Sequence, residues 1–379
     1  MSAPQTALAA APSIDGAMSR LHQHEYWRRL PPPWNSETEE ALLCTHVRAE
    51  THDVKSFFFR SPAGHAFAFT PGQFLTLELD IGGTRLNRCY TISSPPTQPH
   101  TLSITVKRVP GGPVSNWLHD HLSAGMAVRT LGPAGVFSNA LHPAERYLFL
   151  SAGSGITPLM SMARTHRDLC DDRDIVFVHS ARTPDDIIFE RELDLLASNL
   201  SRFRAHFVCE QLGRRPSWHG LTGRLSLPAL ALMAPDFLER TVFTCGPAPY
   251  MRAAREMLAQ AGLNMSRYHE ESFSFDEQAT APAPEPRATS TGSSYTVRFE
   301  RSQRSLGCAA DQTVLDAARA AGLRLPSSCT QGMCGTCKVR LLSGEVDMRH
   351  QGGIRQREID QGMVLLCCSR PLSDLIIEK

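Results

Sequence analysis

The sequence predicts a multidomain fold: an antiparallel β-barrel, then an α/β domain with a parallel sheet, then a small C-terminal domain. Three observations predict it. The chain has 379 residues, which is too long for one compact core. Near residue 145 the pattern changes from short strands to buried strands that alternate with helices. Residues 276–293, rich in Pro, Ala and Ser, then set apart the last segment.

The first predicted domain is the barrel, over residues 39–143. Short β-rich runs such as "SFFFRS", "FLTLELDI" and "TLSITVKRV" are separated by turn residues there, which is typical of antiparallel barrels. Before it, residues 1–38 are rich in Ala and Pro and contain "LPPPW". We expect this stretch to form a poorly ordered N-terminal arm.

The second and third domains follow from later patterns. Over residues 144–275, "RYLFLSAGSGITPLM" combines a buried strand, a glycine turn and a helix, and "DIVFVHSAR" and "TVFTCGP" add buried strands. The linker at 276–293 leads to the third domain, residues 294–379. Its segments "SYTVRFE", "TVLDAARAAG" and "CKVRLLSGEVDM" predict a strand, a helix and a further strand.

Charge and hydropathy limit the classes of partner. The formal net charge is +1, which does not favour nucleic acid or an anionic membrane as a partner. No apolar run reaches the roughly 18 residues that a membrane span needs. The N-terminus lacks a convincing signal peptide, so we expect a cytoplasmic protein. In a reducing cytoplasm, its eleven cysteines favour metal binding over disulfides.

A cysteine cluster near the C-terminus is the most specific motif. "CTQGMCGTC" contains Cys329, Cys334 and Cys337, and "LLCCSRP" offers Cys367 or Cys368 as a fourth ligand. With Cys367 the spacing is C-x4-C-x2-C-x29-C, the plant-type pattern of a [2Fe–2S] cluster. A zinc site usually has two C-x2-C pairs and only one exists here, while plain thiols remain a third interpretation.

Two glycine turns in the α/β domain follow predicted buried strands. Gly153 and Gly155 let the backbone approach a diphosphate at a helix start, although the third glycine of the dinucleotide fingerprint is missing. A plain strand–helix turn is therefore an alternative. Cys245 in "TCGPAPYM" is predicted at a strand's carboxyl end, where ligands bind in such sheets. Alone, it would more often be a small buried apolar residue.

The barrel contributes the motif "RLNRCYTISSP". There Arg88, Tyr90 and Thr91 offer a guanidinium for phosphate, an aromatic face for a flavin ring and a hydroxyl for its N5 atom. An ordinary strand with a surface arginine is the alternative. "GGPVSNWLH" adds a glycine turn in which Ser115 leads into a helix, a second phosphate cradle that is weak alone.

In combination these stretches resemble the ferredoxin–NADP reductase superfamily. They match its R-x-Y-[ST], G-x-x-S, G-x-G-x-x-P and C-G-P motifs in the family's order, over about residues 40–379 apart from the linker. The C-terminal stretch resembles plant-type ferredoxin domains, which implies a β-grasp fold. In those domains the last ligand precedes a proline by four positions, so Pro371 favours Cys367.

The resemblance implies a role for each motif residue. Arg88 holds the flavin phosphate, Tyr90 stacks on the ring and Thr91 faces N5; Thr91 and Cys245 are the catalytic candidates. The implied FAD pyrophosphate residues are Gly112, Val114 and Ser115. The implied nucleotide residues are Gly153, Gly155, Thr157, Pro158, Cys245, Gly246 and Pro247. In "YHEESFSF", Glu271 and Phe273 are expected beside the flavin, with a plain strand edge as the alternative.

The domain order resembles that of reductase components of Rieske-type oxygenases. It is most similar to the reductases of glycine betaine or stachydrine demethylase systems and to the hybrid-cluster protein reductase. This implies electron transfer from NADH through FAD and the cluster to a partner oxygenase, here an N-demethylase. The hybrid-cluster protein or another oxygenase is the alternative acceptor. The linker would let the ferredoxin domain dock against the flavin and then present its cluster outward.

Other interpretations remain open from the sequence. The G-x-x-S turn favours FAD over FMN, and the overall resemblance favours NADH. Arg182 could meet a 2′-phosphate, however, whereas Asp185 or Asp186 could bond a 2′-hydroxyl. A redox sensor and a stand-alone flavin oxidase or nitroreductase are the alternatives from other functional classes.

Overall fold

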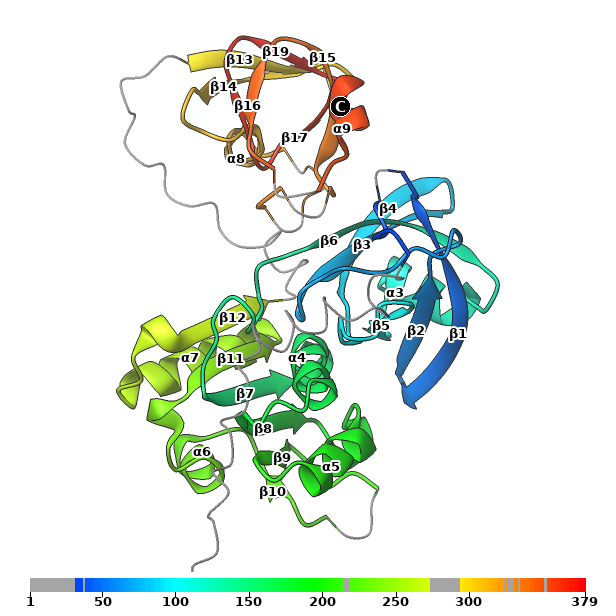
Figure 1. Ribbon diagram of the computed structural model, residues 1–379. Helices are drawn as coiled ribbons and strands as arrows, with labels where there is room; N and C mark the ends of the chain where they lie inside the picture. The colour runs from blue at the N-terminus through cyan, green and yellow to red at the C-terminus, as the bar shows by residue number, and fades with distance from the viewer. Residues whose placement is uncertain are drawn as a thin grey trace, which may run out of the picture.

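The computed structural model describes residues 31–36, 38–214, 218–272, 294–323, 325, 327, 330–332, 335–350 and 353–379. The described chain forms three β-sheet domains, which we call the barrel, the parallel-sheet domain and the C-terminal domain (Figure 1). None of the helices in this described part is long and apolar enough to cross a membrane.

The barrel is an antiparallel sheet in the order β4-β3-β6-β1-β2-β5. A bridge between Ile92, just after β4, and Ile104 on β5 joins the two edges, so the sheet closes as expected. Fully buried Phe57, Phe59 and Leu75 fill its core. The elements are β1 (Ala41–Thr51), β2 (Val54–Arg60), β3 (Phe74–Ile81), β4 (Thr84–Thr91), β5 (Leu102–Lys107), α3 (Pro113–His121) and β6 (Ala127–Ala134).

The described end of the N-terminal arm packs on this barrel. Trp34 is only 6% exposed, and its ring centroid lies 5.6 Å from that of Phe67 in an edge-on contact. Pro33 forms an isolated bridge with Ala66. Residues 1–30 and 37 lie outside the described residues, so the expected poor order of the arm stays a prediction.

The parallel-sheet domain has strands in the order β10-β9-β8-β7-β11-β12, and every pairing is parallel. Helices cover both faces, as a buried parallel sheet requires. On β7, Phe149 packs in the core under α4 and α5, whereas Leu148 packs under α6 and α7. The elements are β7 (Arg146–Ala152), η1 (Gly153–Gly155), α4 (Ile156–Asp168), β8 (Asp174–Ala181), η2 (Pro184–Asp186), α5 (Glu190–Asn199), β9 (Phe203–Cys209), β10 (Leu221–Thr222), α6 (Leu227–Met233), η3 (Phe237–Glu239), β11 (Thr241–Gly246), α7 (Ala248–Gln260), η4 (Met265–Arg267) and β12 (Tyr268–Ser272).

The C-terminal domain has a mixed sheet in the order β14-β13-β19-β15-β17, with α8 packed against it, the expected β-grasp arrangement. A predicted continuous strand is in fact split at Gly344 into β15 and β16, which belong to different sheets. The elements are β13 (Ser294–Phe299), β14 (Arg304–Ala309), α8 (Val314–Ala320), β15 (Lys338–Ser343), β16 (Val346–Met348), α9 (Gln356–Asp360), β17 (Met363–Leu365), β18 (Ser369–Pro371) and β19 (Leu375–Ile377).

Candidate functional site

The predicted flavin motif lies at the end of β4. Arg88 and Tyr90 are half-buried and Thr91 is buried. Arg88 Nη1 donates a hydrogen bond to the carbonyl of Asn87 at 2.9 Å. Burial raises the pKa of the Tyr90 hydroxyl, and the charge of Arg88 opposes this shift. The strand therefore presents a neutral phenol ring beside a cation, which fits a flavin ring and its phosphate.

The second predicted phosphate site is the start of α3. Gly112 is the N-cap of this nine-residue helix, and having no side chain it leaves the first-turn N–H groups without a side-chain cap. Ser115 Oγ closes the turn, since it accepts from the Val109 N–H at 3.1 Å and donates to the Gly112 carbonyl at 3.3 Å. A Cβ on Gly112 would lie 2.9 Å from that Oγ. The first-turn N–H groups and the helix dipole favour an anion here, so the turn suits a diphosphate.

Helix α4 ties the flavin strand to the predicted nucleotide loop. Just beyond Thr91, the Ser94 carbonyl accepts a hydrogen bond from Ser161 Oγ at 2.7 Å, and the Ser93 carbonyl accepts one from Arg164 Nη1 at 2.6 Å. Both donors lie on α4, which begins directly after the glycine turn. No sequence motif indicated this connection. It holds the two predicted binding elements in a fixed relation.

The two glycine motifs of the parallel-sheet domain meet at the carboxyl ends of β7 and β11. A Cβ on Gly155 would lie 2.3 Å from the carbonyl oxygen of Cys245, so only glycine fits this contact. A Cβ on Gly246 would lie 2.9 Å from the ring of Tyr250. Thr157 and Pro158 are buried in the first turn of α4, where Thr157 Oγ1 donates to the Ser154 carbonyl. Pro247 caps α7. The geometry brings the predicted nucleotide residues together.

Buried polar groups line the same edge. Cys245 is fully buried, and burial first, then the charge of Glu271, raises the pKa of its thiol well above the ordinary value. Glu271 lies opposite Cys245 in the β11–β12 register, and burial raises its pKa to about 8. Within the described part of the chain, the buried Glu271 Oε2 has no hydrogen-bond partner, whereas the buried hydroxyls of Tyr250 and Ser180 lie near each other. Such groups fit a polar ligand, and no motif pointed to Tyr250 or Ser180.

Two of the four predicted cluster cysteines can be described. Cys337 and Cys367 are buried, and the Cys367 N–H donates to Cys337 Sγ at 3.5 Å. The Gly332 N–H donates to Cys367 Sγ at 3.3 Å. Gly332 and Gly335 have φ values of 71° and 67°, which favour glycine. Backbone donors aimed at sulfur stabilise thiolates, so the loop suits an iron–sulfur cluster.

Three predicted site residues lie outside the described residues: Cys329, Cys334 and Phe273. The competing fourth ligand, Cys368, is half-buried, and its Sγ donates to the Leu365 carbonyl at 3.7 Å. Of the two candidate fourth ligands, Cys367 is the residue whose backbone N–H donates to Cys337 Sγ.

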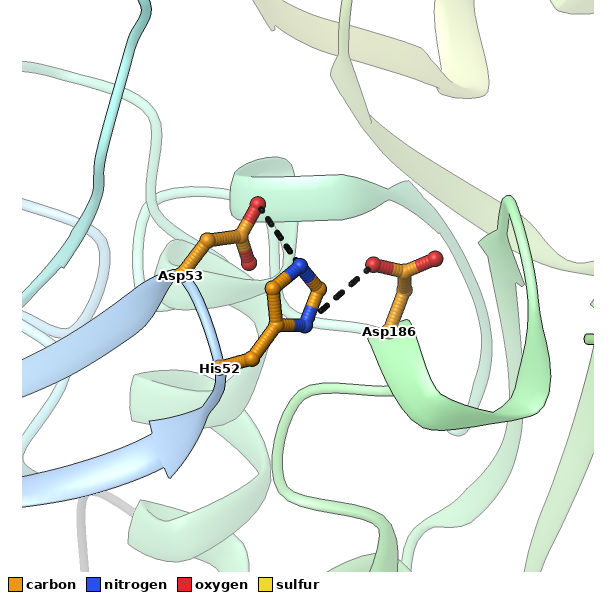
Figure 2. Close-up of side chains that lie close together, drawn as sticks. All are labelled: His52, Asp53 and Asp186. Carbon is orange, nitrogen blue, oxygen red and sulfur yellow. Dashed lines mark ion pairs between the residues drawn. The ribbon is translucent and has the colours of Figure 1, made fainter. Parts of the chain in front are cut away.

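A cavity of about 320 Å³ lies at the carboxyl ends of β8 and β9. At its rim, His52 lies 3.9 Å from both Asp53 and Asp186, which flank its ring (Figure 2). Arg182 pairs with both carboxylates, at 2.9 Å to Asp186 and 3.4 Å to Asp53. Because Arg182 already pairs with both acids, the group is a poor metal site. Its ion pairs instead join the barrel, through Asp53, to the parallel-sheet domain. The cavity is lined by His52, Arg182, Thr183, Asp186, Glu210 and Gln211.

The cavity also bears on the expected ribose contacts. Asp186 accepts hydrogen bonds from the Thr183 N–H at 3.1 Å and from its hydroxyl at 2.8 Å, as a cap of η2. Asp186 and Arg182 therefore pair with each other, and each has a further partner: Thr183 for Asp186 and Asp53 for Arg182. Glu210, which the sequence reasoning missed, lies on the cavity wall.

Comparison with known proteins agrees with this geometry. Residues 42–139 match the family described as oxidoreductase FAD-binding domain, and residues 149–256 match the oxidoreductase NAD-binding domain. Residues 297–372 match the 2Fe-2S iron-sulfur cluster binding domain. The chain is 46% identical over 345 residues to the glycine betaine monooxygenase reductase subunit of Pseudomonas aeruginosa, covering 89% of this chain and 94% of that protein.

The chain belongs to the iron–sulfur flavoprotein reductases of oxygenase systems. It is also 42% identical over 361 residues to the stachydrine N-demethylase reductase subunit of Rhizobium meliloti, covering 95% of this chain and all of that protein. The 3-ketosteroid-9-alpha-monooxygenase ferredoxin reductase component of Mycobacterium tuberculosis is 33% identical over 355 residues, with 88% and 94% covered. This reductase is therefore an NAD(P)H-dependent oxidoreductase, and the family resemblance is confirmed.

Solved structures show the same domain set. Phthalate dioxygenase reductase, described as a modular structure for electron transfer from pyridine nucleotides to [2Fe-2S], matches with a TM-score of 0.51 and 26% identity. The match covers 89% of this reductase and 97% of that chain. An intact type IV self-sufficient cytochrome P450 monooxygenase matches with a TM-score of 0.56 and 26% identity, covering 90% of this chain but 41% of that longer one.

Proposed function

We propose that this reductase passes electrons from NADH through FAD and a [2Fe–2S] cluster to a Rieske-type oxygenase that removes an N-methyl group. The full-length similarity to reductases of glycine betaine monooxygenase and stachydrine N-demethylase carries this proposal. Bound FAD supplies the change from two-electron to one-electron chemistry, and the cluster carries single electrons. We further propose a cytoplasmic location, where NADH is available and cysteine ligands stay reduced.

In this proposal the barrel holds the flavin. The Arg88 guanidinium binds a flavin phosphate, Tyr90 covers the ring and the Thr91 hydroxyl faces N5. The N-terminus of α3, at Gly112, Val114 and Ser115, binds the pyrophosphate. The neutral state of Tyr90 supports its place against an uncharged ring, because burial disfavours its ionised form.

The parallel-sheet domain binds the nicotinamide nucleotide. Gly153, Gly155 and Gly246 let the backbone approach it, with Thr157, Pro158 and Pro247 shaping the helix starts. Cys245 stays a neutral thiol that packs beside the nicotinamide and excludes water. Glu271, with its raised pKa, holds a proton next to Cys245. Phe273 completes the flavin side in this proposal.

Cys329, Cys334, Cys337 and Cys367 hold the cluster. The contacts between Cys367 and Cys337 support this set over one with Cys368. We also retain the proposed division into an arm (1–38), three domains (39–143, 144–275 and 294–379) and a linker (276–293). The three matched family segments lie inside these domains.

We propose NADH over NADPH because of charge around the cavity. Its wall carries Glu210 and Asp186, and its cation Arg182 is already paired with two carboxylates. A 2′-phosphate would meet the carboxylates of Glu210 and Asp186 there, of which Glu210 is paired with Arg224 at 3.3 Å, whereas a 2′-hydroxyl would find acceptors.

Formaldehyde release tests the proposal. The chain, NADH, a Rieske-type oxygenase from the same cell and glycine betaine are mixed, with cytochrome c reduction measured in parallel. Formaldehyde that requires all components supports the N-demethylase assignment. Cytochrome c reduction without formaldehyde, for any such oxygenase, would show that the acceptor is wrong while the relay is right.

A further inference from the structure

One arginine of the C-terminal domain, Arg355, is buried against the surface of the barrel. The Arg355 side chain has no exposed area. Its Nη2 donates to Glu78 Oε2 at 3.0 Å and to the Thr130 carbonyl at 2.8 Å, and its Nε donates to the Ser36 carbonyl at 3.0 Å. These acceptors come from β3, β6 and the end of the arm. A guanidinium is removed from water only at high cost unless it is paired, so this contact requires a close fit.

Further charges complement this contact. Lys338 Nζ lies 3.7 Å from the other Glu78 oxygen and donates to Glu358 at 2.8 Å. Arg357 bonds Glu40 of the barrel. Two carboxylates of the barrel thus face three cations of the C-terminal domain, and each domain adds one charge to the set: Arg129 pairs with Glu40 and Glu78, and Glu358 pairs with Lys338 and Arg355. The centre of the set is buried, so salt screens it less than a surface pair.

The contact is continuous with the cysteine loop. The Gly353 N–H, two residues before Arg355, donates to the Gly332 carbonyl at 2.9 Å. Gly335, between Cys334 and Cys337 in sequence, approaches Asn87, since a Cβ there would lie 3.3 Å from the Asn87 amide nitrogen. Asn87 immediately precedes Arg88 of the flavin motif. Figure 1 shows the C-terminal domain over the side of the barrel that carries β3, β4 and β6.

We propose that Arg355 is a positioning residue for internal electron transfer: its buried contact with Glu78 locks the cysteine loop against the flavin strand. The inference rests on the proposed function, because it assumes a flavin on β4 and a cluster in the loop. Arg355 touches neither group in this proposal. It acts by holding two domains in one arrangement, so that a single electron crosses from the flavin to the cluster without a preceding movement of the C-terminal domain.

Rapid mixing with NADH without oxygen tests the role, because flavin reduction and cluster reduction are followed separately by absorbance. Arg355→Met leaves Glu78 with only the longer contacts to Lys338 at 3.7 Å and Arg129 at 3.8 Å, and Glu78→Gln leaves Arg355 with only Glu358, at 3.9 Å. The matched control is Arg298→Met, whose arginine pairs with Glu300 inside the C-terminal domain. The double variant Arg355→Met with Glu78→Leu replaces the pair by apolar groups, which restores a buried contact in other proteins. Small-angle scattering of each variant reports domain separation without electron transfer.

The expected result is a split between the two rates. Flavin reduction by NADH stays unchanged, while cluster reduction slows by roughly tenfold or more in both single variants, as the loss of one partner of a buried pair predicts. Scattering shows an expanded particle for these variants, and the double variant recovers both properties. Unchanged cluster reduction in folded single variants would overturn the proposal. If wild-type NADH-reduced flavin never reduces the cluster, the proposed function fails, although the scattering result would still report the contact.

Discussion

At the scale of single residues, the site depends on side chains that burial keeps uncharged. Cys245 and Glu271 face each other on neighbouring strands, and both have raised pKa values. A thiolate and a carboxylate side by side would repel a nucleotide phosphate and each other. As a neutral pair, they offer a dry, proton-holding wall.

Glu271 predicts a pH dependence of stability. Its ordinary pKa of 4.5 rises to about 8 in the folded protein, so between these values the folded state binds a proton that the unfolded state releases. The free energy of unfolding should therefore fall as pH rises from 4.5 to 8. Glu271→Gln should remove this part of the decline in denaturant titrations of the ligand-free protein. Glu239→Gln, an exposed control, should not. An identical pH slope in wild type and Glu271→Gln would contradict the assignment.

The adjacent cysteines give a matched pair of variants. Cys367→Ser should lose the cluster. The Cys367 sulfur accepts a hydrogen bond from the Gly332 N–H, and the Cys367 N–H donates to Cys337 Sγ. Cys368→Ser should keep two irons per chain, as a [2Fe–2S] centre contains. Iron content and the visible spectrum of the purified variants measure this. The reverse outcome would make Cys368 the ligand.

Glu210 should limit the use of NADPH. Glu210→Lys replaces a negative group on the cavity wall by a positive one, so kcat/KM for NADPH should rise by about fivefold, the scale of one exposed charge pair. Activity with NADH should hold. Glu239→Lys, outside the cavity lining, is the control. Steady-state kinetics with both nucleotides decides, and an unchanged NADPH value would place the ribose elsewhere.

At the scale of elements, close contacts between strand ends shape the nucleotide site. Gly155 at the end of η1 sits against the Cys245 carbonyl, with no room for a Cβ. Gly155→Ala should cost about 1–3 kcal/mol of stability, as overpacking does, and weaken NADH binding. Gly307→Ala, on β14, where the added Cβ would meet only Ser294 Oγ at 3.5 Å and φ is not positive, should leave stability and NADH binding intact. Thermal unfolding and nucleotide titration of both variants make the comparison. Normal NADH binding by Gly155→Ala would exclude this loop from the site.

Some elements were predictable and others were not, for physical reasons. β7, β8 and β11 are buried on both faces, so they show as continuous apolar runs that the sequence reveals directly. β1 was missed because "ALLCTHVRAET" mixes exposed charges with its buried Leu42 and Cys44. The contact between Arg355 and Glu78 joins residues 277 positions apart, and "GGIRQREID" looks like an ordinary polar surface. Such pairing between domains has no local pattern.

The candidate site divides in the same way. Its short motifs could be found because glycine, cysteine and proline mark backbone requirements at fixed spacing. The groups that complete the site could not. Ser180 and Tyr250 gain their positions only from the sheet order, and Glu210 reaches the cavity only because β8 and β9 are neighbours.

At the scale of the whole molecule, polar contacts join the domains along the proposed path of the electron. Thr97 of the barrel bonds Asp168 of α4 at 2.6 Å, and Arg182 of the parallel-sheet domain pairs with Asp53 of the barrel. Arg355 then fixes the C-terminal domain to the barrel. The barrel therefore contacts both other domains, as expected if the flavin lies between the nucleotide and the cluster.

This arrangement predicts that the cluster is the exit for electrons. Without it, small oxidants should still take electrons from the flavin, but protein acceptors should not. The most direct measurement compares NADH-dependent reduction of ferricyanide and of cytochrome c by wild type and by flavin-loaded Cys367→Ser. We expect the variant to keep ferricyanide reduction and to lose cytochrome c reduction. Undiminished cytochrome c reduction by a variant shown to lack iron would contradict the relay.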